Sequence, residues 1–378
     1  MSLQSMGRGI PDYSKLVCPV VNNACPPTQV KPKAAPTPVP AGDRMVCNLG
    51  LNENGLGPSP KAVEAMETAL RLSNLYPDDS HHQLKQALAK RHGVPAEMIH
   101  ITCGGSEFLF QIGRLFLAPG DESIMAKPGF ILYPEIAKQT GSTLVEIKGK
   151  RYEHNLPKMA DAITERTKVI WVVNPSNPSG TYNNAKEVEE FVRAVDDRCL
   201  IVFDEAYCEF VEAPDYPRAT KYLLEGRKVC VMCTFSKSWG LAGLRVGYGI
   251  ADPGLLRYVP AVRMKYSVNR LGEIAALAAL ADEEFLEKSR AFVRRAKEYY
   301  YRELDRLGLD YVPTHANFIL LDTGINSRLM NDRLVRRGFR IRPGDNFGLR
   351  THIRVTFGTP EENVRFITAL EEALGEGK

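Results

Sequence analysis

The segment Cys233-Thr-Phe-Ser-Lys-Ser-Trp-Gly-Leu-Ala-Gly-Leu-Arg-Val-Gly-Tyr248 decides how the rest of the chain is interpreted. It begins at the end of an apolar run, Val229–Cys233, that predicts a buried strand, and it places Lys237 just after that strand. Open α/β sheets bind their ligands outside the carboxyl ends of the strands, so the amine of Lys237 is expected at a binding site. Arg245 adds a fixed positive charge suited to bidentate contact with a phosphate group.

Further apolar runs alternate with helical patterns through the middle of the chain. Helical stretches such as Ser106–Phe116 and Ala185–Val195 lie between most of them. This rhythm predicts an α/β fold, with a mostly parallel sheet flanked by helices. The predicted strands are Met98–Thr102, Ser123–Ala126, Ser142–Ile147, Val169–Val173, Leu200–Phe203 and Val229–Cys233.

The two ends of the chain differ from this middle part. Residues 1–44 are rich in proline, which indicates a flexible or extended arm, or an arm that lies over a neighbouring subunit or the mouth of the binding site and brings Tyr13 within its reach. Residues 45–75 and 273–378 are expected to form a smaller α/β domain, packed against a large domain of residues 76–272. In the C-terminal part, Glu283–Leu307 has a long helical pattern. A final helix is expected after the capping box Thr359–Glu362, with an inner face of Val364, Ile367, Leu370 and Leu374.

Composition narrows the class of protein. The chain has 378 residues, 44% of them hydrophobic and 25% charged, as expected of an ordinary globular protein long enough for about two domains. Its formal charge of +4 is mild and gives no indication of a nucleic-acid partner. No apolar run reaches the roughly 20 residues of a membrane helix, and no signal-peptide pattern is present. A cytoplasmic protein without a membrane partner is therefore expected.

The eight cysteines are scattered along apolar runs and loops, which is typical of reduced thiols. Cys230 and Cys233 have the spacing of a metal-binding pair. Side chains three residues apart on a strand point to opposite faces, however, so no metal site is expected.

The pattern S-K-S-W-G-L-A-G-L-R-V-G-Y around Lys237 resembles the cofactor-lysine segment of the class I/II aminotransferases, the fold type I enzymes that use pyridoxal 5′-phosphate (PLP). The resemblance is closest to the histidinol-phosphate aminotransferase family. It implies that Lys237 forms the Schiff base with the cofactor and then carries the proton between Cα and C4′. Asp204, in Leu200-Ile-Val-Phe-Asp-Glu-Ala-Tyr207, matches the carboxylate that keeps the pyridine nitrogen protonated. Tyr207 matches the phenol that bonds the 3′ oxygen.

The other cofactor contacts follow from the same resemblance. Asn177, in Val172-Val-Asn-Pro-Ser-Asn-Pro-Ser-Gly180, matches a second donor to the 3′ oxygen, and Phe130 matches the ring that stacks on the cofactor. The loop Cys103-Gly-Gly-Ser-Glu107 opens a helix, whose backbone amides suit an anion. The phosphate-binding residues implied are Gly105, Ser106, Glu107, Ser236 and Arg245, with Glu107 standing where the family has Asp.

The resemblance also implies the substrate contacts and a homodimer. Arg354, in an apolar strand, matches an arginine that binds the substrate carboxylate, and Arg342 matches a second arginine near the substrate. Asn54 matches a substrate-side residue in Asn52-Glu-Asn-Gly-Leu-Gly-Pro-Ser-Pro60, where Gly55 replaces the proline of the family. Tyr76 matches a tyrosine that reaches the phosphate of the partner subunit.

Three functions stay open at this point. The first is a biosynthetic aminotransferase that uses glutamate and 2-oxoglutarate as one pair and an amine like histidinol phosphate, or an aromatic amine, as the other substrate. The second is another PLP enzyme of the same fold, such as a decarboxylase or an amino-acid-modifying enzyme. The third is an α/β domain that binds ligands without catalysis. Only the first converts its bound cofactor when glutamate is added, and the third predicts a colourless protein.

Overall fold

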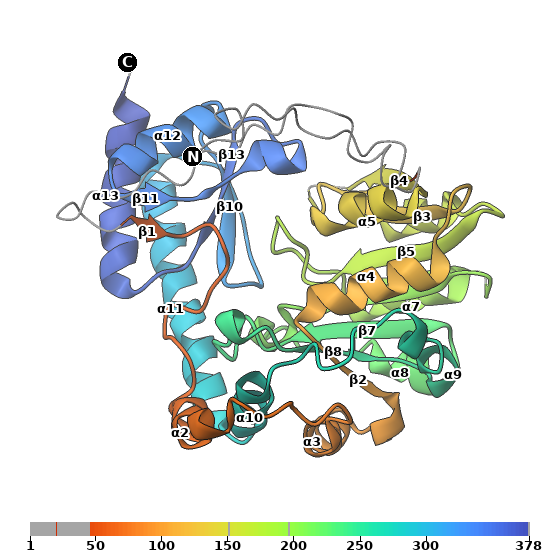
Figure 1. Cartoon of the computed structure of the whole chain (residues 1–378). Coiled ribbons are helices and arrows are strands. Elements are labelled where there is room, and N and C mark those ends of the chain that lie inside the picture. The colour runs from red at the N-terminus through yellow and green to blue at the C-terminus, as the bar shows by residue number, and fades with distance from the viewer. Residues whose placement is uncertain (1–19, 21–45, 150–151, 196, 377–378) are drawn as a thin grey trace, which may run out of the picture.

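The computed structural model describes residue 20 and residues 46–149, 152–195 and 197–376 (Figure 1). Apart from Val20, the predicted arm of residues 1–44, Tyr13 included, lies outside the described residues. Two layered bodies stand side by side, a large one around a seven-stranded sheet and a smaller one around a four-stranded sheet. The domain boundaries expected from the sequence stay predictions.

All six predicted strands are present in the seven-stranded sheet, whose order is β2-β8-β7-β6-β5-β3-β4. The neighbours β7, β6, β5, β3 and β4 run parallel, so their carboxyl ends meet at one edge. This arrangement confirms the mostly parallel α/β sheet. The strands are β2 (Ile99–Thr102), β3 (Glu122–Lys127), β4 (Thr143–Lys148), β5 (Thr167–Val173), β6 (Leu200–Asp204), β7 (Val229–Thr234) and β8 (Gly247–Ile250).

One strand of this sheet, β8, is absent from the sequence-based prediction. It lies between β2 and β7 and runs antiparallel to both. Two of its four residues are glycines, which weaken the usual pattern of a strand. Gly249 is required by packing, because a Cβ there would overlap the ring of Phe108 on the helix that covers the strand.

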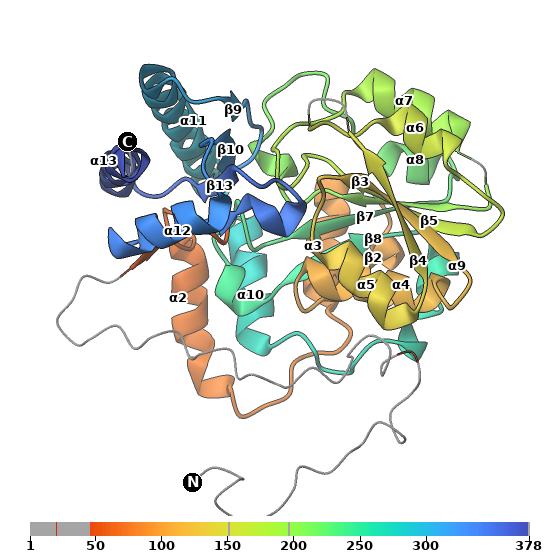
Figure 2. The same cartoon turned by 90° about the horizontal axis from the view of Figure 1, so that it is seen from above.

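Helices cover both faces of the large sheet (Figure 2). On one face lie α4 (Gly105–Phe116) and α5 (Leu132–Thr140), which pack on alternate strand residues such as Trp171 and Met232. The helices on the opposite face pack on the remaining strand residues, such as Val231 and Cys233. These helices are α3 (His82–His92), α6 (Leu156–Asp161), α7 (Ala185–Ala194), α8 (Thr220–Leu224) and α10 (Arg270–Leu280). The short helices α2 (Pro60–Ala69) and α9 (Pro253–Leu256) complete this body.

The smaller body is built on the antiparallel sheet β12-β13-β10-β9. Its strands are β9 (Tyr311–Val312), β10 (Phe318–Asp322), β12 (Arg342–Pro343) and β13 (His352–Thr356). The helices α11 (Glu283–Leu307), α12 (Ser327–Arg336) and α13 (Pro360–Gly375) pack with it in one apolar cluster. A two-stranded parallel sheet joins β1 (Cys47–Asn48) to β11 (Phe339–Arg340), which brings the start of the described chain to the C-terminal part.

The helix predicted over Glu283–Leu307 is present as α11, and the capping box predicted at Thr359–Glu362 starts α13, whose inner face needs one correction. Thr359 and Glu362 make both capping-box hydrogen bonds. Val364, predicted on the inner face, is 51% exposed, and Phe366 is buried there instead. Ile367 and Leu370 are buried as predicted, so the inner face differs from the prediction by about one residue at the start of the helix, where Asn363 is buried. Among the described residues, no helix is both long and apolar enough to cross a membrane.

Candidate active site

A cavity of about 320 Å³ lies at the carboxyl edge of the large sheet, where the smaller body meets it. The ends of β5, β6 and β7 and the start of α4 form one side, and β12 and β13 supply arginines from the other. Eleven of the residues singled out from the sequence line this cavity: Gly105, Ser106, Phe130, Asn177, Asp204, Tyr207, Ser236, Lys237, Arg245, Arg342 and Arg354.

One end of the cavity is suited to an anion. Helix α4 starts here, so its first backbone amides point toward the space beside Ser106. Arg245 donates from Nη1 to Oγ of Ser236 over 3.3 Å and to the backbone oxygen of Ala242 over 2.9 Å. Gly104 has φ +75°, and a Cβ there would overlap the guanidinium of Arg245. The glycine therefore lets the cation approach the helix start, and together they make a positively charged cup.

Lys237 follows β7 and extends into the middle of the cavity. Its Nζ donates a 3.0 Å hydrogen bond to the backbone oxygen of Leu51, from the segment before α2. Burial, and then the positive charge of Arg354, lower the pKa of Lys237 from 10.5 to about 8. A considerable fraction of this amine is therefore neutral, and so nucleophilic, near neutral pH.

Asp204 ends β6 at the floor of the cavity and is only 2% exposed. The hydroxyl of Tyr133 donates to its Oδ2 over 2.9 Å, and the backbone N–H of Ala206 donates to Oδ1 over 3.2 Å. Burial raises the pKa of Asp204 to about 6, although these two hydrogen bonds and the charge of Lys237 act in the opposite direction. A buried carboxyl group without an ion pair among the described residues is suited to a cationic ligand atom.

Tyr207 stands beside Asp204 with its hydroxyl in a network of amides. Asn52 donates from Nδ2 to the tyrosine oxygen over 2.8 Å, and Asn177 donates over 3.4 Å. The oxygen thus has two donors and keeps its own proton to give to a ligand. Burial raises the pKa of Tyr207, so this proton is retained at neutral pH.

Arg354 reaches the cavity from β13 and is 4% exposed. It donates from Nη1 to Oδ1 of Asn177 and from Nη2 to the backbone oxygen of Gly50 over 2.8 Å. Its Nε has no hydrogen-bond partner among the described residues. Burial, and to a smaller extent the nearby Arg342, lower the pKa of Arg354 to about 10, so the side chain stays cationic at neutral pH. Two neighbouring cations on this side can bind an anionic group of a ligand.

Three predicted residues do not line the cavity. Glu107 faces its own loop, where its carboxylate accepts from the backbone N–H of Cys103 and from the hydroxyl of Ser267. Asn54 donates to the backbone oxygen of Ser238 and to the hydroxyl of Ser289, and accepts from the amide of Leu56. Tyr76 is 78% exposed on the surface, where it packs against Tyr266.

Two residues of the site were not selected from the sequence. Asn52 lines the cavity and contacts Tyr207, and its position inside the quoted Asn52–Pro60 segment was the available signal. Tyr133 lies in the first turn of α5, three residues after Phe130, and this closeness in sequence was the available signal. It also stacks on Trp171 at 4.9 Å, which fixes the ring below Asp204.

The departure at Gly55 also has a structural reason. A Cβ at this position would lie 2.8 Å from Cζ of Phe292 on α11 and 3.2 Å from the backbone carbon of Gly358. The ring of Phe292 therefore occupies the space that a side chain at position 55 would need.

Comparison with known proteins agrees with this geometry. The sequence model described as "Aminotransferase class I and II" matches residues 44–370. A histidinol-phosphate aminotransferase from Moorella thermoacetica is 42% identical over 88% of this chain and 86% of that protein. Another, from Caldicellulosiruptor saccharolyticus, is 38% identical over 88% of this chain and 93% of its own length. The crystal structure of histidinol-phosphate aminotransferase from Sinorhizobium meliloti in complex with pyridoxal 5′-phosphate is similar, with a TM-score of 0.84 and 30% identity. It covers 88% of this chain and 92% of its own.

Proposed function

This chain belongs to the class I and II aminotransferases, and we propose that it exchanges an amino group between an amine like histidinol phosphate and 2-oxoglutarate. The chain is a PLP-dependent aminotransferase, with an amino acid and an oxo acid as its kinds of substrate. The observation that carries the finer proposal is the convergence of Lys237, Asp204 and the cationic cup on one cavity that arginines close from the other side.

The residues of the cavity fit the cofactor in charge and in position. The cup of Ser106, Ser236 and Arg245 at the start of α4 would hold the dianionic phosphate. Asp204, buried without a cation, would hold the protonated ring nitrogen at the other end. Asn177 and Tyr207 would donate to the ring oxygen, and Phe130 would stack on the ring.

Bound PLP supplies an electron sink that stabilises negative charge at the substrate Cα. The chain supplies the proton movements and the orientation. Lys237 would hold the cofactor covalently, and its free amine would take the proton from Cα, because its lowered pKa makes the neutral form more available than in an ordinary lysine. Asp204 keeps the ring nitrogen protonated, and Tyr133 holds the carboxylate in place. Leu51 accepts from the lysine amine, so the segment before α2 orients it.

The substrate side rests on two arginines. Arg354 is buried, cationic and partly unpaired among the described residues, so we assign it the carboxylate common to glutamate and 2-oxoglutarate. Arg342 also lines the cavity and would bind the second anionic group of either substrate, a phosphate or a side-chain carboxylate. Both relatives named above are histidinol-phosphate aminotransferases, which favours the phosphate-bearing amine.

A homodimer belongs to the same proposal. Tyr76 is 78% exposed and lies among exposed apolar side chains of the same segment: Leu70, Leu72 and Leu75. Several exposed apolar side chains in one short segment are typical of a protein interface. We infer that this segment packs against a second copy, whose phosphate cup Tyr76 would complete.

The test combines trapping with a substrate panel. Borohydride reduction of the purified yellow protein should add the mass of the cofactor to the peptide with Lys237. Lys237→Ala should abolish this, and the exposed Lys265→Ala should not. Histidinol phosphate, aromatic amino acids and other amines are then compared by kcat/KM with 2-oxoglutarate as acceptor. A preference for an amine without phosphate, or release of carbon dioxide in place of amino transfer, would contradict the proposed substrate.

A further inference from the structure

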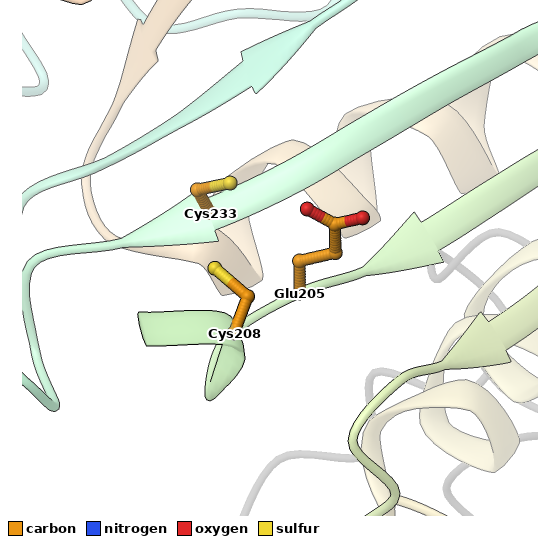
Figure 3. Close-up of side chains that lie close together, drawn as sticks. All are labelled: Glu205, Cys208 and Cys233. Carbon is orange, nitrogen blue, oxygen red and sulfur yellow. The ribbon is translucent and has the colours of Figure 1, made fainter. Parts of the chain in front are cut away.

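A second group of reactive side chains lies behind the cavity, on the opposite face of the sheet from α4. Glu205, Cys208 and Cys233 each direct one ligand atom into a shared space (Figure 3), and these atoms all lie within 4.8 Å of one another. Glu205 and Cys208 follow β6, and Cys233 is near the end of β7. None of the three lines the cavity described above.

Strand pairing brings this group together. The backbone N–H of Glu205 donates to the backbone oxygen of Met232 over 2.9 Å, so Glu205 lies next to Cys233 across the parallel pair. The short turn after Glu205 returns the chain, and the N–H of Cys208 donates to the backbone oxygen of Glu205 over 3.1 Å. The three positions are therefore fixed by backbone hydrogen bonds and do not depend on flexible loops.

Glu205 is a buried carboxyl group with few protein partners. Glu205 is 8% exposed, and no ion pair joins it to a Lys, Arg or His side chain of the described residues. Among the described residues, the backbone amide of Ala219 donates to this carboxyl group. A buried carboxylate normally has a cation or several donors, because burial of an unpaired charge is costly.

The other two ligands indicate which cation would suit. Cys233 is 1% exposed, and both sulfurs are free thiols. Thiolate sulfur together with carboxylate oxygen is a ligand set for Zn²⁺, and is not one that Mg²⁺ or Ca²⁺ prefers. Around a tetrahedral zinc ion with bonds of about 2.0–2.3 Å the ligand atoms are roughly 3.3–3.8 Å apart. Small side-chain rotations bring the present group to that spacing.

We propose that Glu205, Cys208 and Cys233 form a zinc site, with water as the fourth ligand. On binding, the two thiols and the carboxyl group each lose their proton to solvent, and the two thiolates and the carboxylate bond to the ion with no change of oxidation state. The ion joins the turn after β6, which carries Asp204 and Tyr207, to β7, which leads to Lys237. It thus fixes the catalytic residues on neighbouring strands relative to one another.

The CxxC spacing of Cys230 and Cys233 is not part of this site. Cys230 packs on the other face of the sheet, with Trp171 and Met232, while Cys233 packs with Val231. The side chains do point to opposite faces, as the strand geometry requires. The partner of Cys233 comes from the next strand in the sheet, which sequence spacing alone does not reveal.

Metal analysis of the holoenzyme tests the proposal. The untagged protein is produced with added zinc and purified without chelator, and its metal content is measured by mass spectrometry; about one zinc per chain is expected. The double variant Cys208→Ser/Cys233→Ser and Glu205→Gln should lose the metal. Cys230→Ala, which removes a thiol from the same strand but the opposite face, should retain it.

Two further measurements keep the test independent of variant folding. X-ray absorption at the zinc edge of the wild-type protein should show two sulfur ligands together with oxygen, and chelation should lower Tm until zinc is restored. Absence of zinc from the wild type, zinc bound without sulfur, or full zinc content in a folded double variant would each overturn the proposal. A Cys208–Cys233 disulfide in the metal-free protein would overturn it in favour of a redox pair.

Discussion

The hydroxyl of Tyr133 donates a 2.9 Å hydrogen bond to Oδ2 of Asp204 beneath the cavity, and both side chains are almost fully buried. The tyrosine comes from α5 on one face of the sheet, and the aspartate ends the strand at its edge. Trp171 stacks on the tyrosine ring and leaves it little freedom to turn. The hydrogen bond therefore stabilises the ionised form of a carboxyl group whose burial opposes ionisation.

Tyr133→Phe should weaken cofactor binding in a pH-dependent way. Loss of the donor raises the pKa of Asp204 above its present value of about 6, so less carboxylate is available at neutral pH. We expect about a tenfold loss of PLP affinity near neutral pH, since a hydrogen bond to a charged group contributes about 1.5–3 kcal/mol. The loss should shrink as pH rises and the carboxyl group ionises. Tyr182→Phe, which removes a hydroxyl bonded to Asp215 at the surface, is the control. A loss that is independent of pH would show that Tyr133 only fills space.

Incorporation of PLP into the apoenzyme should follow the ionisation of Lys237. Only the neutral amine attacks the aldehyde, and the pKa of Lys237 is lowered to about 8 by burial and by the charge of Arg354. The rate should rise with pH, reach half its maximum near pH 8 and then level off. Stopped-flow absorbance measures this rate across the neutral and alkaline range. A rate still rising at the ordinary lysine pKa of 10.5 would contradict the shifted value.

Features that depend on residues close together in the sequence were predicted more reliably than contacts between distant parts of the chain. The placement of Lys237 and Asp204 at one edge of the sheet could be predicted, because Lys237 follows the apolar strand β7, Asp204 ends the apolar strand β6, and parallel strands bring their carboxyl ends together. Asn54 was selected from a motif, yet its side chain binds Ser238 and Ser289 and does not reach the cavity. The sequence pattern does not distinguish Asn54 from Asn52, which does line the cavity. The difference lies in the backbone, which is left-handed at Asn52 (φ 57°).

Contacts between elements were the least accessible to sequence analysis. The strand β8 was missed because Gly249 makes room for Phe108, a residue far away in the chain. The same applies to the proximity of Glu205, Cys208 and Cys233, which results from the register of β6 against β7. Register between strands is decided by the whole core, so its consequences appear only in three dimensions.

Gly240→Ala should destabilise the protein and disturb the catalytic lysine. Gly240 has φ +70°, and a Cβ there would overlap the backbone of Gly57, in the segment that leads into α2. Its amide also bonds the backbone oxygen of Lys237 over 3.1 Å. We expect a cost of about 3 kcal/mol from strain and overlap together. Gly226→Ala, at φ +80° with nothing within 4 Å, isolates the strain alone at about 1–2 kcal/mol. Equal Tm values for the two variants would contradict the packing argument.

Arg354→Lys should separate substrate binding from cofactor binding. Lysine keeps the charge but loses the planar pair of donors that suits a carboxylate. Loss of one charged hydrogen bond of about 1.5–3 kcal/mol corresponds to a rise of about 10- to 100-fold in KM for 2-oxoglutarate. The absorbance of the bound cofactor should persist. Arg340→Lys, an exposed arginine close to Arg342 in sequence, should leave KM unchanged. An unchanged KM in Arg354→Lys would remove this residue from the substrate site.

Mixed dimers can show whether Tyr76 acts in the partner subunit. Tyr76→Phe alone should weaken PLP binding, and Lys237→Ala alone should be inactive. If Tyr76 completes the other subunit's cup, a mixed dimer of these two variants contains one site with both Lys237 and Tyr76 intact. Unfolding and refolding an equal mixture should therefore restore high-affinity PLP binding and activity to a fraction of the sites. If Tyr76 instead served its own chain, every site with Lys237 would still lack the phenol, and mixing would restore nothing. The exposed position of Tyr76, away from the cavity of its own chain, favours the first outcome.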